Sequence, residues 1–249
     1  ESRSIHVLDI YVNDLLITGS NPDAVEDMLK SMKAKFDTQD LGNATSVLGM
    51  EMHHNRDSKV LHLSQRKYAD NILRRFGMEM CNSAPTPGDF DAFHPVGKEL
   101  LSSIDHGTYR EIVRSLLCLC RLTRPDISCA VMQLSRVVSK PDALLRLERG
   151  AGSILKGTLS MGIKYVGKDV SSSGPVLEGY CDADYRGDLA TRRSTTGYVY
   201  VYVLAQGPIV WDSKLQTIAQ SSTESEYIGL ASAGNEAVYL RELLASRLY

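Results

Sequence analysis

The stretch HVLDIYVNDLLITGSN, residues 6–21, carries the first residues whose types and spacing could do chemistry. Its alternating pattern predicts two strands joined by a tight turn, with Asn13 and Asp14 at the bend. Two carboxylates at such a bend would indicate a divalent-metal site. Here the first of the pair is an amide, which offers one neutral oxygen and no charge. The pair therefore predicts a weaker cation cage than two aspartates would form.

The elements that must position this turn follow it along the chain. Apolar residues recur at three- and four-residue spacing from Val25 to Phe36, after Asn21 and Pro22, which predicts a capped amphipathic helix. A hairpin is predicted from residues 47–52 and 60–63, and a second helix, capped by Ser64, follows it. We expect residues 1–80 to form one α+β unit. Glycine and proline in residues 81–107 predict a linker.

The spacing of apolar residues changes within the second half of the chain. Residues 108–168 predict helices, and Pro125 should open the second of them. From residue 176 the period becomes two, which predicts strands at 176–185, 196–204 and 208–213. The Tyr/Val alternation in the second strand favours a sheet that is covered on both faces.

A long helix is predicted to close the chain from Ser222 to about residue 247. Thr223 is expected as its N-cap and Glu226 at the third position of a capping box.

Composition is ordinary for a globular protein, with 249 residues, 43% hydrophobic, 23% charged and a net charge of −2. Residues 110–156 hold nine Lys/Arg against four Asp/Glu (+5), whereas residues 178–249 hold six against nine (−3). This asymmetry fits a basic surface for phosphates beside an acidic metal site. Two solvated helix faces of unlike sign explain it equally well.

Cysteine and histidine usage indicates neither disulfides nor a zinc site. The five cysteines are odd in number and form no C-x-x-C pair, so we expect a reduced, intracellular protein. No apolar run approaches the roughly 20 residues of a membrane helix, so no membrane partner is expected. His53 and His54 are neighbours and should point to opposite sides of a strand, and no metal site is predicted from them.

Several segments together carry a resemblance to a known family. The stretch YVNDLLITGSN is similar to the YVDD turn of reverse transcriptases, and DLGNATSVLGMEM, LHLSQRKYADNILRRFGM, TRPDIS and LKGT resemble later landmarks of copia-type retrotransposon Pol polyproteins. The stretch from GYCDADYRGD to the TESEY and LREL segments resembles the start of the ribonuclease H domain of that family. The resemblance runs in order over nearly the whole chain.

The resemblance implies RNA-directed DNA synthesis for the first part. Such polymerases hold two Mg²⁺ ions between the two carboxylates of the turn and a third from an earlier strand. Asp14 matches one of these catalytic and metal-binding positions, whereas Asn13 replaces the other. The earlier strand is expected to lie outside this chain. Polymerisation is therefore not expected.

The resemblance implies cleavage of RNA in RNA–DNA hybrids for the last part. Asp182 matches the central-strand aspartate and Glu226 the helix glutamate of a two-metal site, and two further acidic positions are expected beyond Tyr249. Asp184 is either a helper metal ligand on the same strand face or a residue of the strand-end turn. We expect impaired or absent ribonuclease H activity and loose Mg²⁺ binding.

Several residues allow two interpretations, a contact to nucleic acid or a structural role. Arg192 and Arg193 could contact phosphates or form a polar turn, and Lys214 and Gln216 could line a hybrid groove. Trp211 fits the core better than a groove.

The sequence thus predicts an α+β fold in which a partial reverse-transcriptase palm and connection precede a truncated ribonuclease H-like mixed sheet with helices. The expected units are 1–80, the linker 81–107, the helical region 108–168 and the incomplete ribonuclease H-like domain 176–249. The alternative is a non-catalytic module that binds nucleic acid or protein. The strand of Asp182 is expected to be an open sheet edge that self-associates or is filled by residues 159–166 or by a partner's strand.

Overall fold

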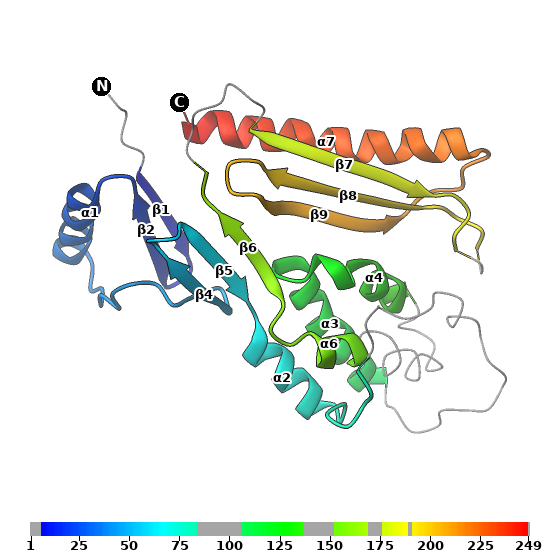
Figure 1. The fold of residues 1–249 in the computed structure, drawn as a ribbon, viewed down its shortest axis with the longest axis horizontal. Coiled ribbons are helices and arrows are strands. Elements are labelled where there is room, and N and C mark those ends of the chain that lie inside the picture. Colours follow the sequence, from blue (N-terminus) through cyan, green and yellow to red (C-terminus); the bar gives the residue numbers. More distant parts are fainter. Residues whose placement is uncertain (1–5, 84–105, 137–151, 169–175, 189–190, 249) are drawn as a thin grey trace.

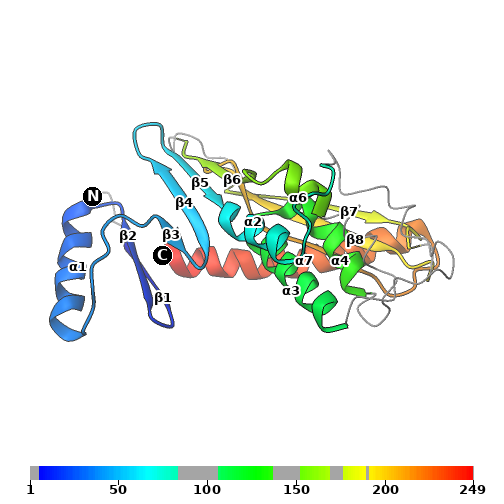
Figure 2. The same ribbon diagram turned by 90° about the horizontal axis from the view of Figure 1, so that it is seen from below.

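The computed structural model of the chain describes residues 6–83, 106–136, 152–168, 176–188 and 191–248. Within these ranges the chain forms three antiparallel sheets and six α-helices, which confirms the α+β class. Figures 1 and 2 show the sheets following one another along the molecule, with the helices between and beside them. Most of the predicted linker 81–107 and the predicted helical residues 137–151 lie outside the described ranges.

The first unit is a two-stranded hairpin with a helix beside it. Strands β1 (His6–Tyr11) and β2 (Asp14–Gly19) pair so that Tyr11 lies opposite Asp14, and α1 (Pro22–Lys35) follows. The Asn21 side chain accepts a hydrogen bond of 3.0 Å from the Asp23 N–H, so the predicted cap is confirmed. No residue from 6 to 63 is buried. Tertiary packing therefore contributes little to holding this unit.

The second sheet has the order β3-β4-β5-β6. Its strands are β3 (Ser46–Val47), β4 (Met50–Asn55), β5 (Val60–Ser64) and β6 (Gly162–Val166). The prediction of one strand over residues 47–52 was wrong, because Leu48 and Gly49, with φ of 51° and 76°, turn the chain back between β3 and β4. Strand β6 is supplied from about a hundred residues further along and pairs with β5.

Helix α2 (Arg66–Arg75) begins differently from the prediction. Ser64 is the last residue of β5, and Gln65 stands at the N-cap position without a side-chain capping bond. The predicted Ser64 cap is therefore wrong. The Gln65 side chain instead accepts a bond of 2.8 Å from the Thr123 hydroxyl in the protein interior.

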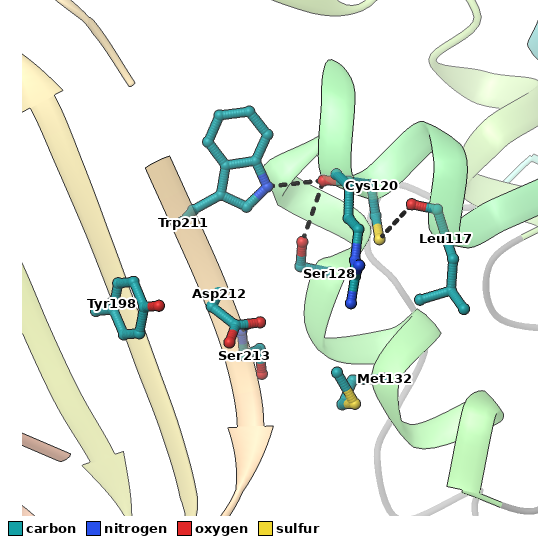
Figure 3. A pocket seen from close by; sticks show the side chains of 9 residues that line it. Leu117, Cys120, Ser128, Met132, Tyr198, Trp211, Asp212 and Ser213 are labelled. Atoms are coloured by element: carbon teal, nitrogen blue, oxygen red, sulfur yellow. Dashed lines mark hydrogen bonds between the residues drawn. The ribbon is translucent and has the colours of Figure 1, made fainter. Parts of the chain in front are cut away.

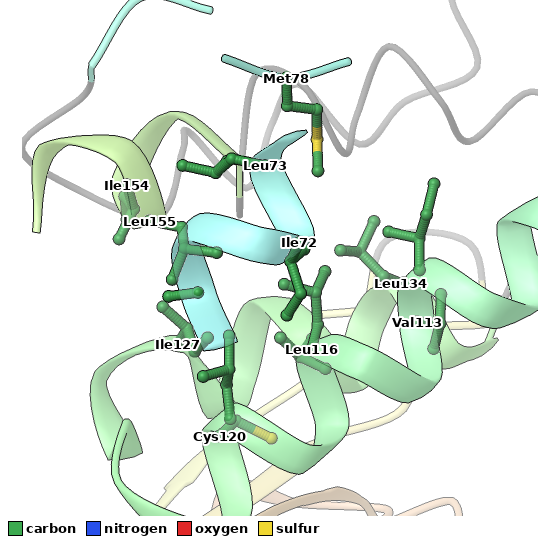
Figure 4. Close-up of a cluster of buried hydrophobic side chains, with 14 of the residues drawn as sticks. Ile72, Leu73, Met78, Val113, Leu116, Cys120, Ile127, Leu134, Ile154 and Leu155 are labelled. Atoms are coloured by element: carbon green, nitrogen blue, oxygen red, sulfur yellow. The ribbon is translucent and has the colours of Figure 1, made fainter. Parts of the chain in front are cut away.

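The main hydrophobic core lies among the helices (Figure 4). Side chains of α2, α3 (His106–Leu122), η2 (Pro125–Ile127), α4 (Ser128–Arg136) and α6 (Ser153–Gly157) meet there. Its fully buried members include Leu116, Ile127 and Leu155, each 0% exposed. Arg124 is buried beside them and binds Asp126 and the Thr158 carbonyl, at 2.7 and 3.0 Å. Pro125 opens the short helix η2 rather than α4 directly.

The C-terminal layer, residues 176–248, contains three strands and a long helix. Strands β7 (Leu177–Asp184), β8 (Thr195–Tyr202) and β9 (Gly207–Leu215) form the sheet, and α7 (Ser222–Leu248) runs along it (Figure 1). The Tyr200 hydroxyl donates to the Ala233 carbonyl of α7 at 2.6 Å, and the Trp211 indole donates to the Cys120 carbonyl of α3 at 2.7 Å. Helices therefore contact both faces of the sheet, as the Tyr/Val alternation predicted.

Strand β7 is an edge strand, since within the described residues it pairs only with β8. The suggestion that residues 159–166 fill this edge was wrong: β6 pairs with β5 in the other sheet. The physical reason is that β5 already offers β6 a partner edge beside the helical core, in register over five residues.

The start of α7 also differs from the prediction. The Ser221 hydroxyl accepts a bond of 3.1 Å from the Glu224 N–H, and the Glu224 carboxylate accepts one of 2.6 Å from the Gln220 N–H. The cap is therefore Ser221 with Glu224, two residues before the predicted pair of Thr223 and Glu226. This shift leaves the Glu226 carboxylate free of the capping role.

Candidate functional site

The turn that carries Asn13 and Asp14 is a two-residue hairpin connection. Val12 occupies its first position with φ of 52°, a left-handed conformation that strains a β-branched residue. The Val12 side chain is 83% exposed, and both Asn13 and Asp14 are exposed. The turn presents its side chains to solvent at the tip of a hairpin that contains no buried residue. Asp14 therefore lacks a packed surrounding that would hold its carboxylate in place.

Asp182 of β7 and Glu226 of α7 lie on two elements that pack against each other. A Cβ atom added to Gly229 of α7 would lie 3.5 Å from the Cys181 sulfur and 3.6 Å from the Ala183 Cβ, so the helix packs directly on the strand beside Asp182. Glu226 lies about one turn earlier on the same helix. Burial raises the pKa of the Cys181 thiol, and the negative charges of Glu226 and Asp182 raise it further. Both charges act on the Cys181 thiol, but Cys181 faces α7, so the neighbouring Asp182 side chain points to the opposite face of the sheet.

A buried polar cluster fixes the first turn of α7 to the sheet. The Gln216 side chain, in a residue that is 4% exposed, donates to the Thr196 hydroxyl at 2.7 Å and to the Ser225 carbonyl at 2.9 Å. The Ser225 hydroxyl donates back to the side-chain amide oxygen of Gln216 at 3.0 Å. Because Ser225 precedes Glu226, this cluster fixes the helix turn that carries Glu226, whose own side chain is exposed. Gln216 is therefore buried and does not line a groove, contrary to that sequence interpretation.

Asp184 belongs to the strand-end turn. A Cβ atom added to Gly187 would lie only 1.6 Å from an Asp184 carboxylate oxygen, so that carboxylate lies against the Gly187 backbone. Of the two sequence interpretations of Asp184, the position beside this turn favours the structural one. By strand alternation its side chain shares a face with Asp182, and Cys181 and Ala183 face α7.

The donor set fits Mg²⁺ in kind but is incomplete. Mg²⁺ prefers oxygen ligands and keeps several waters when only one or two carboxylates bind it, and Asp182 and Glu226 are both exposed. Strand alternation points the Asp182 side chain away from α7, so the described structure does not bring these two carboxylates together. Within the described ranges, no three Asp, Glu, His or Cys side chains are arranged to hold a metal ion. Asp14 lies on a different sheet from Asp182 and is not brought to it.

The basic residues predicted to contact nucleic acid have different surroundings. Arg193 is half-buried, and its guanidinium donates to the Gln216 carbonyl at 2.5 Å, which ties the start of β8 to the end of β9. The Lys214 ammonium lies 6.0 Å from the centre of the Tyr198 ring. Arg192 is exposed, in a turn with φ of 55°. Arg192 is thus the most accessible of the three for a phosphate.

A cavity of about 290 Å³ lies where α3 and α4 meet β9 (Figure 3). Cys120, Tyr198, Trp211 and Asp212 line it. Burial raises the pKa of the Cys120 thiol to about 11, so the thiol remains protonated at neutral pH and is a poor nucleophile. Burial, followed by the charges of Asp212 and Glu236, raises the pKa of Tyr198 to about 12. Trp211 is half-buried rather than part of the buried core, and its indole connects the sheet to α3.

Comparisons with known proteins identify a family and several relatives of the chain. Residues 2–89 match the family described as reverse transcriptase (RNA-dependent DNA polymerase). The chain is 34% identical over 249 residues to the retrovirus-related Pol polyprotein from transposon TNT 1-94 of Nicotiana tabacum, an alignment that covers 96% of the chain and 18% of that protein. The corresponding polyprotein from transposon RE1 of Arabidopsis thaliana is 37% identical over 252 residues, with coverage of 97% and 16%.

A shorter relative matches over most of both chains. An uncharacterized mitochondrial protein of Arabidopsis thaliana is 34% identical over 242 residues, and the alignment covers 92% of each chain. No solved structure matches the chain.

The α+β fold and the match of residues 2–89 define a chain of the reverse transcriptase class. The chain belongs to the family of copia-type retrotransposon Pol polyproteins. It spans less than a fifth of the length of the two transposon polyproteins it matches. Among the helices described, none is both long and apolar enough to cross a membrane.

Proposed function

We propose that the chain is a reverse-transcriptase and ribonuclease H segment whose C-terminal layer binds RNA–DNA hybrids, with Asp182 and Glu226 as two of the metal-binding carboxylates. The observation that carries the proposal is the close approach of α7 to β7 at Gly229, which places the helix turn of Glu226 beside the strand that carries Asp182. The buried Gln216 cluster holds this approach in place. The proposed units are 1–80, 108–168 and 176–249, with a linker at 81–107.

In this proposal the Mg²⁺ ions, when bound, activate water and steady the scissile phosphate. Asp182 and Glu226 supply negative oxygen ligands from two elements whose relative position is fixed. Arg192 is exposed beside the layer and suits a contact to the hybrid backbone. Because two carboxylates leave most of the Mg²⁺ shell to water, binding should be loose and cleavage slow or absent in this chain.

We further propose that the hairpin unit does not support DNA synthesis. Asn13 replaces a carboxylate at the turn, and an amide does not supply the negative charge that two-metal catalysis needs. The exposed, unpacked surroundings of Asp14 support the same conclusion.

The test is hybrid cleavage and Mg²⁺ binding by the full chain. Asp182→Asn and Glu226→Gln should each abolish any Mg²⁺-dependent cleavage and weaken Mg²⁺ binding. Glu178→Gln, on the same strand and equally exposed, is the matched control and should change neither. A tight Mg²⁺ site that survives the Asp182→Asn/Glu226→Gln double variant would disprove the assignment.

A second candidate function is a non-catalytic binding module. The observation that favours it is the set of large apolar side chains left exposed in residues 6–63, including Ile10 at 62%, Tyr11 at 60% and Leu41 at 86%. Exposed apolar surface of this kind is typical of interaction sites. Hybrid binding that weakens steeply with salt and shows no turnover would support a nucleic-acid binder. Concentration-dependent association without nucleic-acid binding would support a protein partner, including self-association through the open β7 edge.

A further inference from the structure

The second sheet brings together two histidines that are nine positions apart in the sequence. His53 of β4 lies directly opposite His62 of β5 in the antiparallel register. His62 in turn lies opposite Lys164 of β6, so the three side chains form one row across the sheet. His54 pairs with Leu61 and points to the opposite face. The neighbours in sequence are therefore separated, and the distant pair is placed together.

The backbone bonds define the spacing of this pair. The Met52 N–H donates to the Thr45 carbonyl at 2.8 Å, on the β3 side of β4, so the polar backbone groups of His53 point toward β5. His53 and His62 are therefore a hydrogen-bonded cross-strand pair, with Cβ atoms about 5 Å apart. Two imidazoles at that spacing can both reach one ion at the usual metal–nitrogen distance of about 2.0–2.1 Å. His53 is exposed and His62 only half-buried, so the row is open to solvent.

We propose that His53 and His62 form a binding site for a late first-row transition-metal ion such as Zn²⁺ or Ni²⁺. Imidazole is a preferred ligand of these ions, whereas the oxygen ligands Asp182 and Glu226 suit Mg²⁺. Two protein nitrogens bind the ion and water completes its coordination. A bound ion joins β4 to β5 and stabilises the hairpin between the first unit and the helical core. The site is independent of the proposed nuclease function.

The chemistry of the row distinguishes a metal from an anion. Metal ions bind neutral imidazole, whereas a phosphate would require protonated rings. Lys164 adds one positive charge, which disfavours a metal ion and favours an anion. Inorganic phosphate is therefore the appropriate competing probe, and Lys164→Gln should strengthen metal binding.

The experiment is a titration of the full chain with Zn²⁺ and with Ni²⁺ near pH 7.5, with excess Mg²⁺ present to occupy the carboxylates. One ion should bind per chain and raise the melting temperature. His53→Gln and His62→Gln should each weaken binding about tenfold or more, because a single imidazole remains. His54→Gln is the matched control and should bind like the parent chain.

Two controls separate loss of the metal site from loss of folding. Circular dichroism of each variant shows whether the fold is kept, and Lys164→Gln provides a gain of affinity that loss of folding cannot produce. Unchanged affinity in His53→Gln and His62→Gln, or an equal loss in His54→Gln, would overturn the inference. Binding of phosphate, with no metal bound, would assign the row to an anion instead.

Discussion

The two regions that carry the proposed metal-binding carboxylates differ in how firmly the chain holds them. Asp14 lies on a hairpin in a segment, residues 6–63, that contains no buried residue. Asp182 and Glu226 lie in a layer where Gln216, Thr196 and Ser225 are buried and hydrogen-bonded to one another. The backbone that carries the carboxylates is therefore held by buried contacts in only one of the two regions.

The difference between the hairpin and the C-terminal layer follows from how much apolar surface each one buries. A two-stranded hairpin with a helix beside it buries little apolar surface and is marginal by itself. The C-terminal layer combines a three-stranded sheet with contacts to helices on both faces. Local opening should therefore occur at a much lower free energy in the hairpin than in the layer.

Removing the Gln216 side chain tests the layer and should have the largest effect. Gln216→Ala leaves Thr196 and Ser225 with unpaired buried groups, which should cost about 2–4 kcal/mol of unfolding free energy. Urea unfolding measures this cost, and amide exchange should show faster opening of the first turn of α7. Gln39→Ala, at an exposed position in the first unit, is the control and should change stability by less than about 0.5 kcal/mol. Equal stability of the two variants would remove the contrast between the regions.

Relieving backbone strain in the β1–β2 hairpin should increase stability, by less than the loss of the Gln216 side chain reduces it. Val12→Gly allows the positive φ of 52° without a Cβ penalty, so the hairpin should become more stable by about 1 kcal/mol. Amide exchange of β1 and β2 is the suitable measurement, since global unfolding reports mainly on the packed regions. Faster exchange in the variant would show that the valine is not strained in solution.

The contact between α4 and the loop after β7 should make a pH-dependent contribution to the unfolding free energy. The pKa of Asp188 lies below its ordinary value of 3.8: partial burial raises it, but hydrogen bonds from Thr191 and the Arg136 ion pair together outweigh burial. A lowered carboxyl pKa stabilises the fold above the unfolded-state value, and this stabilisation is lost as the pH falls through the folded-state value.

Arg136→Gln should therefore reduce stability modestly at neutral pH, and the difference from the parent chain should shrink below about pH 4. Melting temperatures measured between neutral and acidic pH would show this convergence. A difference that stays constant across the range would mean that the ion pair contributes nothing through Asp188.

Restoring the missing carboxylate should have no catalytic effect. Asn13→Asp adds a second acidic group at the turn, but the exposed hairpin does not hold the pair in a defined geometry. Primer extension on an RNA template should therefore remain absent. Extension by the variant, together with none by the parent chain, would show that the hairpin is organised well enough for catalysis.

The sequence by itself determined the elements whose signals are local. The β1–β2 hairpin, α1 with its Asn21 cap and the three strands of the last sheet follow from periodicity, turn residues and side-chain capping. These elements depend on residues a few positions apart, so the chain itself encodes them. The metal-binding roles of Asp182 and Glu226 rest on the resemblance and stay predictions.

Only the tertiary structure decided how distant segments meet. Three features depend on tertiary contacts: the pairing of β6 with β5, the division of β3 from β4 and the shift of the α7 cap to Ser221. The same holds for the burial of Gln216 against Ser225 and for the placement of His53 opposite His62. The physical reason is that strand register and buried polar partners are selected by the packing of the whole fold, and a one-residue shift in register would move each of these side chains to the other face.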